Sequence, residues 1–301
     1  MGRRLPVAGE PPRLRTFAGA TALVTGAGSG IGEALSKALA ARGARVVVTD
    51  RRGEEAARVA AAIRAASGDA EHETLDVRDA VAFGSVVERV FSSHGRLDYL
   101  FNNAGIAVAG EVIDFSLQDW RDILDVNVLG VVHGVHAAYP RMVRQGFGHL
   151  VNTASMAGLM PAPFVSAYGM SKHAVVGLSR SLRAEAARYG VRVSALCPGI
   201  VRTPIADGGA FGRYLRRPSP EFLEYLMRRL HAMAPDVFAP KVLDQVARNR
   251  GRIIVPWWWR AADWVNRAAP VLGDWLGERA FAAIKSELDK GSRPPADTSE
   301  D

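Results

Sequence analysis

The chain has 301 residues, of which 48% are hydrophobic, and carries a formal net charge of +7. This size suits one large α/β domain or two small ones, and the single cysteine, Cys197, excludes an internal disulfide framework or a thiolate zinc cluster. Arginines supply most of the charge without forming an aromatic-interleaved basic cluster, so the composition argues against a nucleic-acid partner.

Both ends of the chain are predicted to be flexible tails, over residues 1–16 and 291–301. The first is basic and proline-rich and lacks the apolar segment of a secretion signal. No apolar run between the tails approaches the ~20 residues that span a bilayer. We therefore expect a cytoplasmic protein without a transmembrane segment.

Short Val/Leu-rich runs alternate with helical patterns from Ala20 onward. The expected strands lie at 20–26, 44–50, 72–77, 96–105, 148–155 and 191–199, and the expected helices at 31–42, 54–66, 79–94, 117–144 and 167–189. Continuous apolar strands that alternate with helices predict a parallel sheet covered on both faces. The fold class is thus a doubly wound, three-layer α/β/α domain.

The first strand is followed by "TGAGSGIG", residues 25–32, a glycine-rich turn that leads into a helix whose first amides can hold a pyrophosphate. Glu33 stands where the third glycine of G-x-G-x-x-G would fall, so an ordinary strand-to-helix turn remains an alternative. Asp50 ends the second strand, close to the position of the acid that grips the ribose of NAD. Its charge would repel the extra phosphate of NADP, although Arg51 and Arg52 partly offset this. NAD is preferred and NADP stays open.

The stretch "SAYGMSK", residues 166–172, places Tyr168 and Lys172 four residues apart in a helical pattern. Residues at this spacing are neighbours on a helix surface. A phenol with a pKa of ~10 is a poor base at neutral pH. One positive charge at ~4 Å supplies about the ~4 kcal/mol that lowers this pKa by ~3, so Lys172 is predicted to make Tyr168 an acid/base.

These motifs together resemble the short-chain dehydrogenase/reductase family over roughly residues 17–256. The resemblance also uses "LDV" at 75–77, "NNAG" at 102–105, "VNVLG" at 126–130, Ser155 and "PG" at 198–199. It implies a single Rossmann-type domain with a sheet of about seven strands, a nicotinamide cofactor, and a homodimer or homotetramer.

The resemblance also implies a role for each matching position. The pyrophosphate turn would comprise Gly26, Ser29, Gly30, Ile31 and Gly32, with Asp50 and Arg51 at the adenosine ribose, Asp76 and Val77 at the adenine, Asn103 beside the ribose, and Ile200 and Thr203 at the nicotinamide amide. The catalytic four would be Asn127, Ser155, Tyr168 and Lys172, with Lys172 also on the nicotinamide ribose. Ser155 would stabilise charge on the substrate oxygen, and Asn127 would anchor a water relay.

The segment at about 205–235 occupies the place of the family's variable substrate lid. Large apolar residues gather there and near the Ser155 loop: Phe211, Tyr214, Leu215, Phe222, Leu223, Leu226 and Met227, with Met156, Leu159, Met160 and Phe164. They predict a pocket for a steroid-, lipid- or terpenoid-like alcohol or ketone. The alternative is that they only pack the lid onto the body.

The extension at 257–290 holds five of the six tryptophans within 19 residues. Beside Arg260 and Arg267 they could anchor an amphipathic segment on a membrane, cover the pocket or dock on another subunit. Docking is preferred, because Pro270 and Gly273 interrupt the helical face.

Two other possibilities follow from single residues. His133 and His136 share a helical face but lack a third ligand, so packing or a subunit contact is expected rather than a metal site. Cys197 is predicted to be a small core residue.

The leading hypothesis is an NAD-dependent oxidoreductase for a hydrophobic alcohol. A non-catalytic dinucleotide-binding regulator and a peripheral membrane adaptor are the alternatives.

Overall fold

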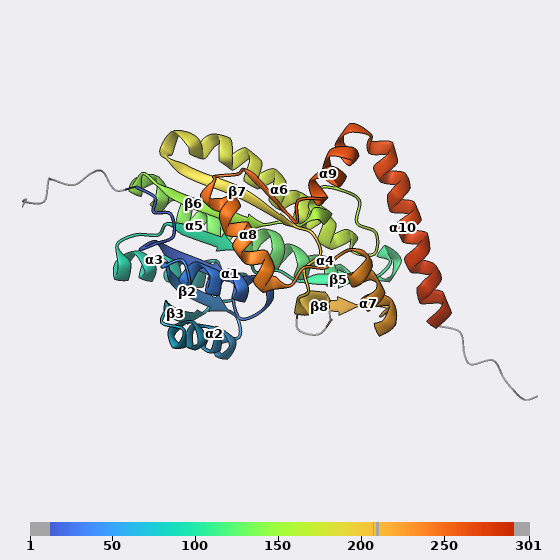
Figure 1. The fold of residues 1–301 in the computed structure, drawn as a ribbon, viewed down its shortest axis with the longest axis horizontal. Coiled ribbons are helices and arrows are strands. Elements are labelled where there is room, and N and C mark those ends of the chain that lie inside the picture. The colour runs from blue at the N-terminus through green and yellow to red at the C-terminus, as the bar shows by residue number, and fades with distance from the viewer. Residues whose placement is uncertain (1–12, 207, 209–210, 292–301) are drawn as a thin grey trace, which may run out of the picture.

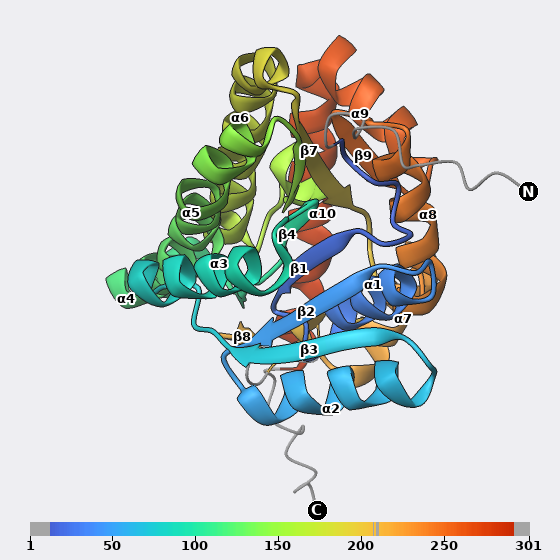
Figure 2. The same ribbon diagram turned by 90° about the vertical axis from the view of Figure 1, so that its left-hand side faces the viewer.

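The computed structural model describes residues 13–206, 208 and 211–291, so most of both predicted tails lies outside it. Seven parallel strands form one sheet in the order β3-β2-β1-β4-β6-β7-β9. Helices cover both faces, which confirms the predicted three-layer doubly wound fold (Figure 1, Figure 2). The strand order reverses between β1 and β4, and a ligand crevice is expected there, beyond the carboxyl ends of the strands.

The strands of the sheet are short and, apart from the edge strand β3, almost wholly buried. They span Thr21–Thr25 (β1), Arg45–Asp50 (β2), Asp69–Thr74 (β3), Tyr99–Asn102 (β4), Gly148–Thr153 (β6), Val191–Pro198 (β7) and Arg252–Val255 (β9). Burial on both faces explains their continuous apolar runs. The position of β3 was predicted wrongly, because the strand expected at 72–77 spans Asp69–Thr74 and residues 75–77 form a loop. The strand expected at 96–105 is shorter, since β4 spans only Tyr99–Asn102.

Three helices lie on each face of the sheet. On one face are α1 (Gly30–Ala40), α2 (Gly53–Ala65) and α8 (Pro235–Ala247), and on the other α3 (Ala80–His94), α5 (Gly130–Gln145) and α6 (Ser166–Ala186). Leu35 and Phe238 belong to the first core layer, and Phe83 and Met142 to the second. Helix α8 is absent from the elements expected from the sequence.

The long helix expected at 117–144 consists of three parts. Helix α4 (Leu117–Leu124) begins with a capping box between Ser116 and Asp119, and it continues through a π-helical turn (Asp125–Leu129) into α5. A π-helical turn widens the helix by one residue and is frequent at functional sites. Here it holds Asn127, which is fully buried.

The segment expected as a lid contains η5 (Pro204–Ala206), β8 (Gly212–Tyr214) and α7 (Pro220–Arg229). Strand β8 pairs in parallel with β5 (Ala107–Ala109), so a second small sheet ties the lid to the loop after β4. Three further 3-10 turns lie at Val112–Asp114 (η1), Met156–Gly158 (η3) and Ala187–Tyr189 (η4).

The extension forms a helical arm of α9 (Trp259–Ala268) and α10 (Pro270–Gly291), which stands away from the sheet (Figure 1). Pro270 separates the two helices as predicted, whereas Gly273 lies inside α10. No helix among residues 13–206 and 211–291 is both long and apolar enough to cross a membrane.

Candidate active site

The glycine turn after β1 presents free backbone amides. Gly26 and Gly30 have φ values of +60° and +55°, which glycine adopts without strain. A Cβ on Gly32 would lie 2.2 Å from the Gly26 carbonyl oxygen, so α1 approaches the turn as closely as glycine permits. Ser29 makes no side-chain cap on α1. The first amides of this helix are thus available to an anion.

Asp50 points back at the turn from the end of β2. Its side chain is 2% exposed, and its Oδ2 accepts a hydrogen bond from the Gly28 amide at 3.0 Å. Its Oδ1 accepts from the Arg52 amide at 3.0 Å and lies 3.6 Å from the Arg52 Nε. The Arg52 guanidinium also lies 4.4 Å from the ring centre of Phe211. A carboxylate has about four acceptor positions, so Asp50 can still accept hydrogen bonds from ribose hydroxyls.

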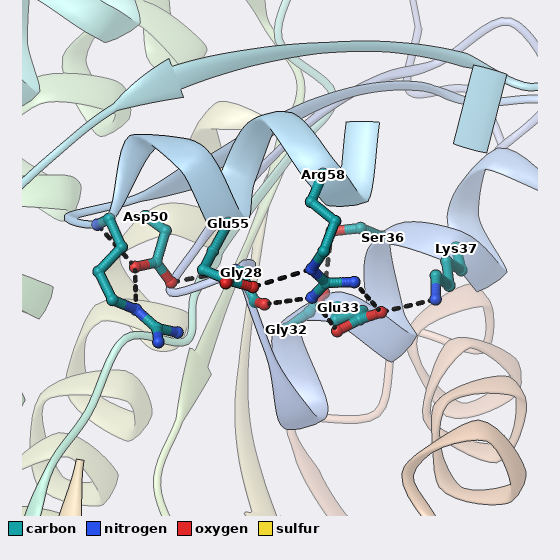
Figure 3. Close-up of polar contacts among 9 residues, drawn as sticks. Gly28, Gly32, Glu33, Ser36, Lys37, Asp50, Glu55 and Arg58 are labelled. Atoms are coloured by element: carbon teal, nitrogen blue, oxygen red, sulfur yellow. Dashed lines mark hydrogen bonds and ion pairs between the residues drawn. The ribbon is translucent and has the colours of Figure 1, made fainter. Parts of the chain in front are cut away.

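Glu33 does not obstruct the turn, because its side chain faces α2 (Figure 3). It accepts hydrogen bonds from Arg58 at 2.9 Å and from Lys37 at 2.6 Å. Burial raises the pKa of Glu33, but these hydrogen bonds outweigh it and hold the pKa below its ordinary value. Arg58 also donates to the Gly28 carbonyl at 2.9 Å. Arg58 thus fastens the turn to α2, although no motif in the sequence marks it.

The loop after β3 forms the far end of the same cleft. Asp76 accepts a hydrogen bond from the Arg78 Nε at 3.0 Å, and this partner holds the pKa of Asp76 below its usual value. Val77 is buried, and its carbonyl contacts the His133 Nδ1 at 2.8 Å. This contact ties His133 to the loop after β3. No trio of His, Cys, Asp or Glu side chains in the described part of the chain could hold a metal.

Two asparagines fix the backbone at the centre of the cleft. Asn103 Nδ2 donates to the Thr25 carbonyl at 3.1 Å and joins the ends of β4 and β1. Asn127 Oδ1 accepts a hydrogen bond from the Ile106 amide at 2.8 Å. Its Nδ2 donates to the Ile106 carbonyl at 2.9 Å and to the Ser171 hydroxyl at 3.0 Å. The π-helical turn therefore holds the loop after β4 against α6.

Ser155, Tyr168 and Lys172 converge from two elements. Ser155 follows β6, and its Oγ accepts from the Ala157 amide at 3.1 Å and also shares a hydrogen bond with Tyr168. Lys172 Nζ donates to the Thr153 carbonyl at 2.8 Å and lies 5.4 Å from the Tyr168 ring centre. The two elements meet closely, because a Cβ on Gly158 would lie 2.6 Å from the Lys172 carbonyl carbon.

In the protein alone, burial dominates the ionisation of this group. Burial raises the pKa of Tyr168, and only its hydrogen bond with Ser155 opposes this. Burial also lowers the pKa of Lys172 to about 8, because no carboxylate compensates the ammonium. In both cases the loss of water around the charged form costs more than the protein's own hydrogen bonds and charges give back.

One cleft connects most of these groups. The predicted residues that line it are Gly26, Ser29, Gly30, Ile31, Asp50, Arg51, Asp76, Val77, Asn103, Ser155, Tyr168, Lys172 and Thr203. Three others stand behind the lining, namely Gly32, Asn127 and Ile200, whose carbonyl accepts from the Met233 amide. Thr153 and Arg78 line the cleft without having been predicted.

A family model described as short chain dehydrogenase matches residues 20–209. The chain is a short-chain dehydrogenase/reductase. The family resemblance predicted from the motifs is thereby confirmed, as is the Rossmann-type fold.

Curated relatives and solved structures agree with this assignment. The oxidoreductase UcpA of Salmonella typhimurium is 36% identical over 218 residues, which cover 72% of this chain and 81% of UcpA. A dehydrogenase of the family from Burkholderia phymatum, solved with NAD, has 31% identity and a TM-score of 0.76 over 86% of this chain and 96% of its own. A protein described as an NAD(P)-dependent gluconate 5-dehydrogenase from Beutenbergia cavernae, with NADP at low occupancy, has 32% identity and a TM-score of 0.71 over 80% and 96%.

The large apolar residues expected around the substrate have mixed positions in this dehydrogenase. Phe211 lines the cleft, and Leu215 packs onto the apolar cluster that contains Val108. Met156 belongs to the core instead, with Leu159 and Met160 packed against it. Cys197 lies in the same cluster, fully buried, where burial raises its pKa to about 12, so its predicted role as a core residue is confirmed.

The arm of this dehydrogenase contacts the loops around the cleft. Trp259 covers Gly199, where an added Cβ would lie 2.3 Å from the indole Nε1. Phe281 stacks on Phe164 with ring centres 5.0 Å apart, and Lys285 forms an ion pair with Glu111. The arm therefore braces the loop between Ser155 and Tyr168 and the loop after β5.

Proposed function

We propose that this short-chain dehydrogenase interconverts a hydrophobic secondary alcohol and its ketone, with NAD as its preferred cofactor and Tyr168 as the acid/base. The observation that carries the proposal is the convergence of Ser155, Tyr168 and Lys172 in the cleft that also contains the glycine turn and Asp50. The uncapped amides of α1 and the close approach of Gly32 fit a pyrophosphate. A regulator without turnover would need this turn but not the acid/base group.

Each residue of the group then has a separate task. Tyr168 takes the proton of the alcohol in oxidation and returns it in reduction, and Ser155 donates to the substrate oxygen as charge develops on it. Bound oxidised nicotinamide would accept the hydride, and its positive charge would favour the phenolate. A protonated Lys172, whose Nζ lies 5.4 Å from the Tyr168 ring centre, would favour the phenolate as well. Asn127 keeps the neighbouring loop in place and would anchor a water behind Lys172.

The preference for NAD rests on the surroundings of Asp50. A 2′-phosphate placed near this buried carboxylate would meet a like charge. Arg52 lies beside Asp50 and is already held by Asp50 and Phe211. Arg51 lines the cleft and offsets the repulsion only in part. Ribose hydroxyls can instead donate to the acceptor positions of Asp50 that the protein leaves open.

The hydrophobic substrate class rests on apolar side chains in the wall of the cleft. They include Ile106, Val126, Val201, Ile205 and Phe211. Such a wall binds an apolar alcohol by removing its surface from water, and it leaves the hydroxyls of a sugar acid unpaired.

The assembly and location of the enzyme are part of the same proposal. We expect a cytoplasmic homodimer or homotetramer formed through α5 and α6. Leu129, Val132 and Met170 are exposed on or next to these helices, and exposed side chains of this size favour a subunit contact.

The test is a screen of the purified protein with NAD and with NADP against steroid, terpenoid, fatty and small polar alcohols, following the absorbance of reduced cofactor. Turnover with NAD and an apolar alcohol, lost in Tyr168→Phe with cofactor affinity retained, supports the proposal. Preference for a polar sugar acid over every apolar alcohol overturns the substrate class. Cofactor binding without any turnover favours the regulator.

A further inference from the structure

The corner between α9 and α10 exposes an unusual amount of apolar surface. Its large side chains are Trp264 (70% exposed), Val271 (79%), Leu272 (42%), Trp275 (46%) and Leu276 (50%). We call these five residues the corner patch. Figure 1 shows this corner as the tip of the arm, away from the central sheet. Several large apolar side chains exposed at one corner mark an interaction site more often than single exposed ones do.

The opposite faces of the arm are already used, so the corner patch cannot fold back onto the body. Trp259 packs against Gly199, and Asn266 donates to the Leu159 carbonyl at 3.0 Å. Further along, Phe281 stacks on Phe164. These contacts fix the arm on both sides of the corner and hold the corner patch outward.

A hollow rich in arginine lies beside Trp264 on α9. It is lined by Arg252, Arg260, Asp263, Trp264 and Arg267, with Ile254 and Ala268. Asp263 pairs with Arg252 at 2.8 Å and is the only carboxylate among these lining residues, so the charges of Arg260 and Arg267 are not compensated within the hollow. Guanidinium groups in such a position suit phosphate oxygens.

A tryptophan of the corner patch carries a further cation. The Arg279 guanidinium lies 4.5 Å from the ring centre of the exposed Trp275. This pairing lets an apolar ring face a hydrocarbon phase while the arginine remains at its polar boundary.

We propose that the corner patch and the arginine hollow dock this enzyme on the surface of a bilayer that contains anionic lipids. The five apolar side chains enter the boundary between headgroups and acyl chains, and Arg260 and Arg267 contact lipid phosphates.

A second copy of the chain fits the corner less well than a bilayer does. A two-fold contact centred on the corner patch would bring the two adjoining arginine hollows close to each other, and like charges would repel. A projecting corner is also easily surrounded by a fluid bilayer.

The test is flotation of the full chain with vesicles of phosphatidylcholine alone and of phosphatidylcholine with phosphatidylglycerol, at low salt. We expect co-flotation with the anionic vesicles, together with a blue shift of tryptophan fluorescence. The double variant Trp264→Ala/Trp275→Ala should bind at least about tenfold more weakly. Arg260→Gln/Arg267→Gln should lose roughly fivefold per arginine on anionic vesicles only.

Matched changes far from the corner serve as controls. Val81→Ser removes an equally exposed apolar side chain on α3, and Arg144→Gln removes an exposed arginine near the end of α5. Both should float like the unmodified chain.

The proposal is overturned if the protein floats with neither vesicle type, or if the control variants lose as much vesicle binding as the corner variants. A change in oligomer size in Trp264→Ala/Trp275→Ala without any flotation would assign the corner to a protein contact instead. None of these readouts depends on the substrate or on turnover.

Discussion

Replacement of Lys172 by methionine is expected to stabilise the protein without cofactor while it abolishes turnover. Lys172 is 3% exposed, and burial lowers its pKa from 10.5 to about 8. At about 1.36 kcal/mol for each pKa step, the buried ammonium costs the fold about 3 kcal/mol below pH 8. The variant loses the hydrogen bond to Thr153, worth about 1 kcal/mol. Because methionine adapts to irregular space, the net gain at pH 7 should be about 2 kcal/mol.

The stability difference between the variant and the wild type should also depend on pH, which a change in packing alone would not cause. The folded-state pKa of Lys172 is lower than its unfolded value. Between about pH 8 and 10.5 the unfolded chain therefore binds more protons, and the wild-type protein becomes more stable as the pH rises. The advantage of the methionine variant should shrink over this same range.

The assay is urea unfolding of both proteins without cofactor at pH 7 and at about pH 10, with turnover measured in parallel. Lys241→Met, at an exposed position on α8, is the matched control and should not show the pH-dependent gap. Turnover of Lys172→Met should fall at least about 100-fold. A variant that is less stable than wild type at pH 7, or a gap that is equal at both pH values, would refute the reasoning.

Three further changes test other parts of the structure. Asp50→Asn removes the charge that repels a 2′-phosphate, so the ratio of kcat/KM for NADP to that for NAD should rise at least about tenfold; an unchanged ratio contradicts the assigned role of Asp50. Gly158→Ala places a Cβ 2.6 Å from the Lys172 carbonyl carbon, so both the urea midpoint and kcat should fall. A normal kcat would show that the loop moves away from Lys172 without disturbing the site. Burial lowers the pKa of His149 to about 3, so the protein should lose up to about 5 kcal/mol as the pH falls from 6.5 towards 3; His149→Asn should flatten this slope in urea titrations.

The sequence predicted the sheet well because each inner strand is buried on both faces and therefore reads as a continuous apolar run. It predicted the cleft for a related reason, since residues that follow parallel strands must meet at one edge of the sheet. Asp50 and Ser155 line the cleft by this logic, whereas Thr203, which also lines it, was predicted from the family resemblance. The edge strand β3 was misplaced by three residues, because its exposed side chains carry no such signal.

Other features depend on contacts between distant segments, which no local pattern contains. The bond from Arg58 to the Gly28 carbonyl joins residues 30 positions apart, and the Phe281 ring meets Phe164 across 117 positions of sequence. The ionisation of Lys172 depends on distant segments in the same way. Its spacing from Tyr168 is written in the sequence, but the burial that lowers its pKa is a sum over the whole fold. Spacing and composition thus determined which groups meet, and the tertiary structure decided how deeply they are buried and which charges remain uncompensated.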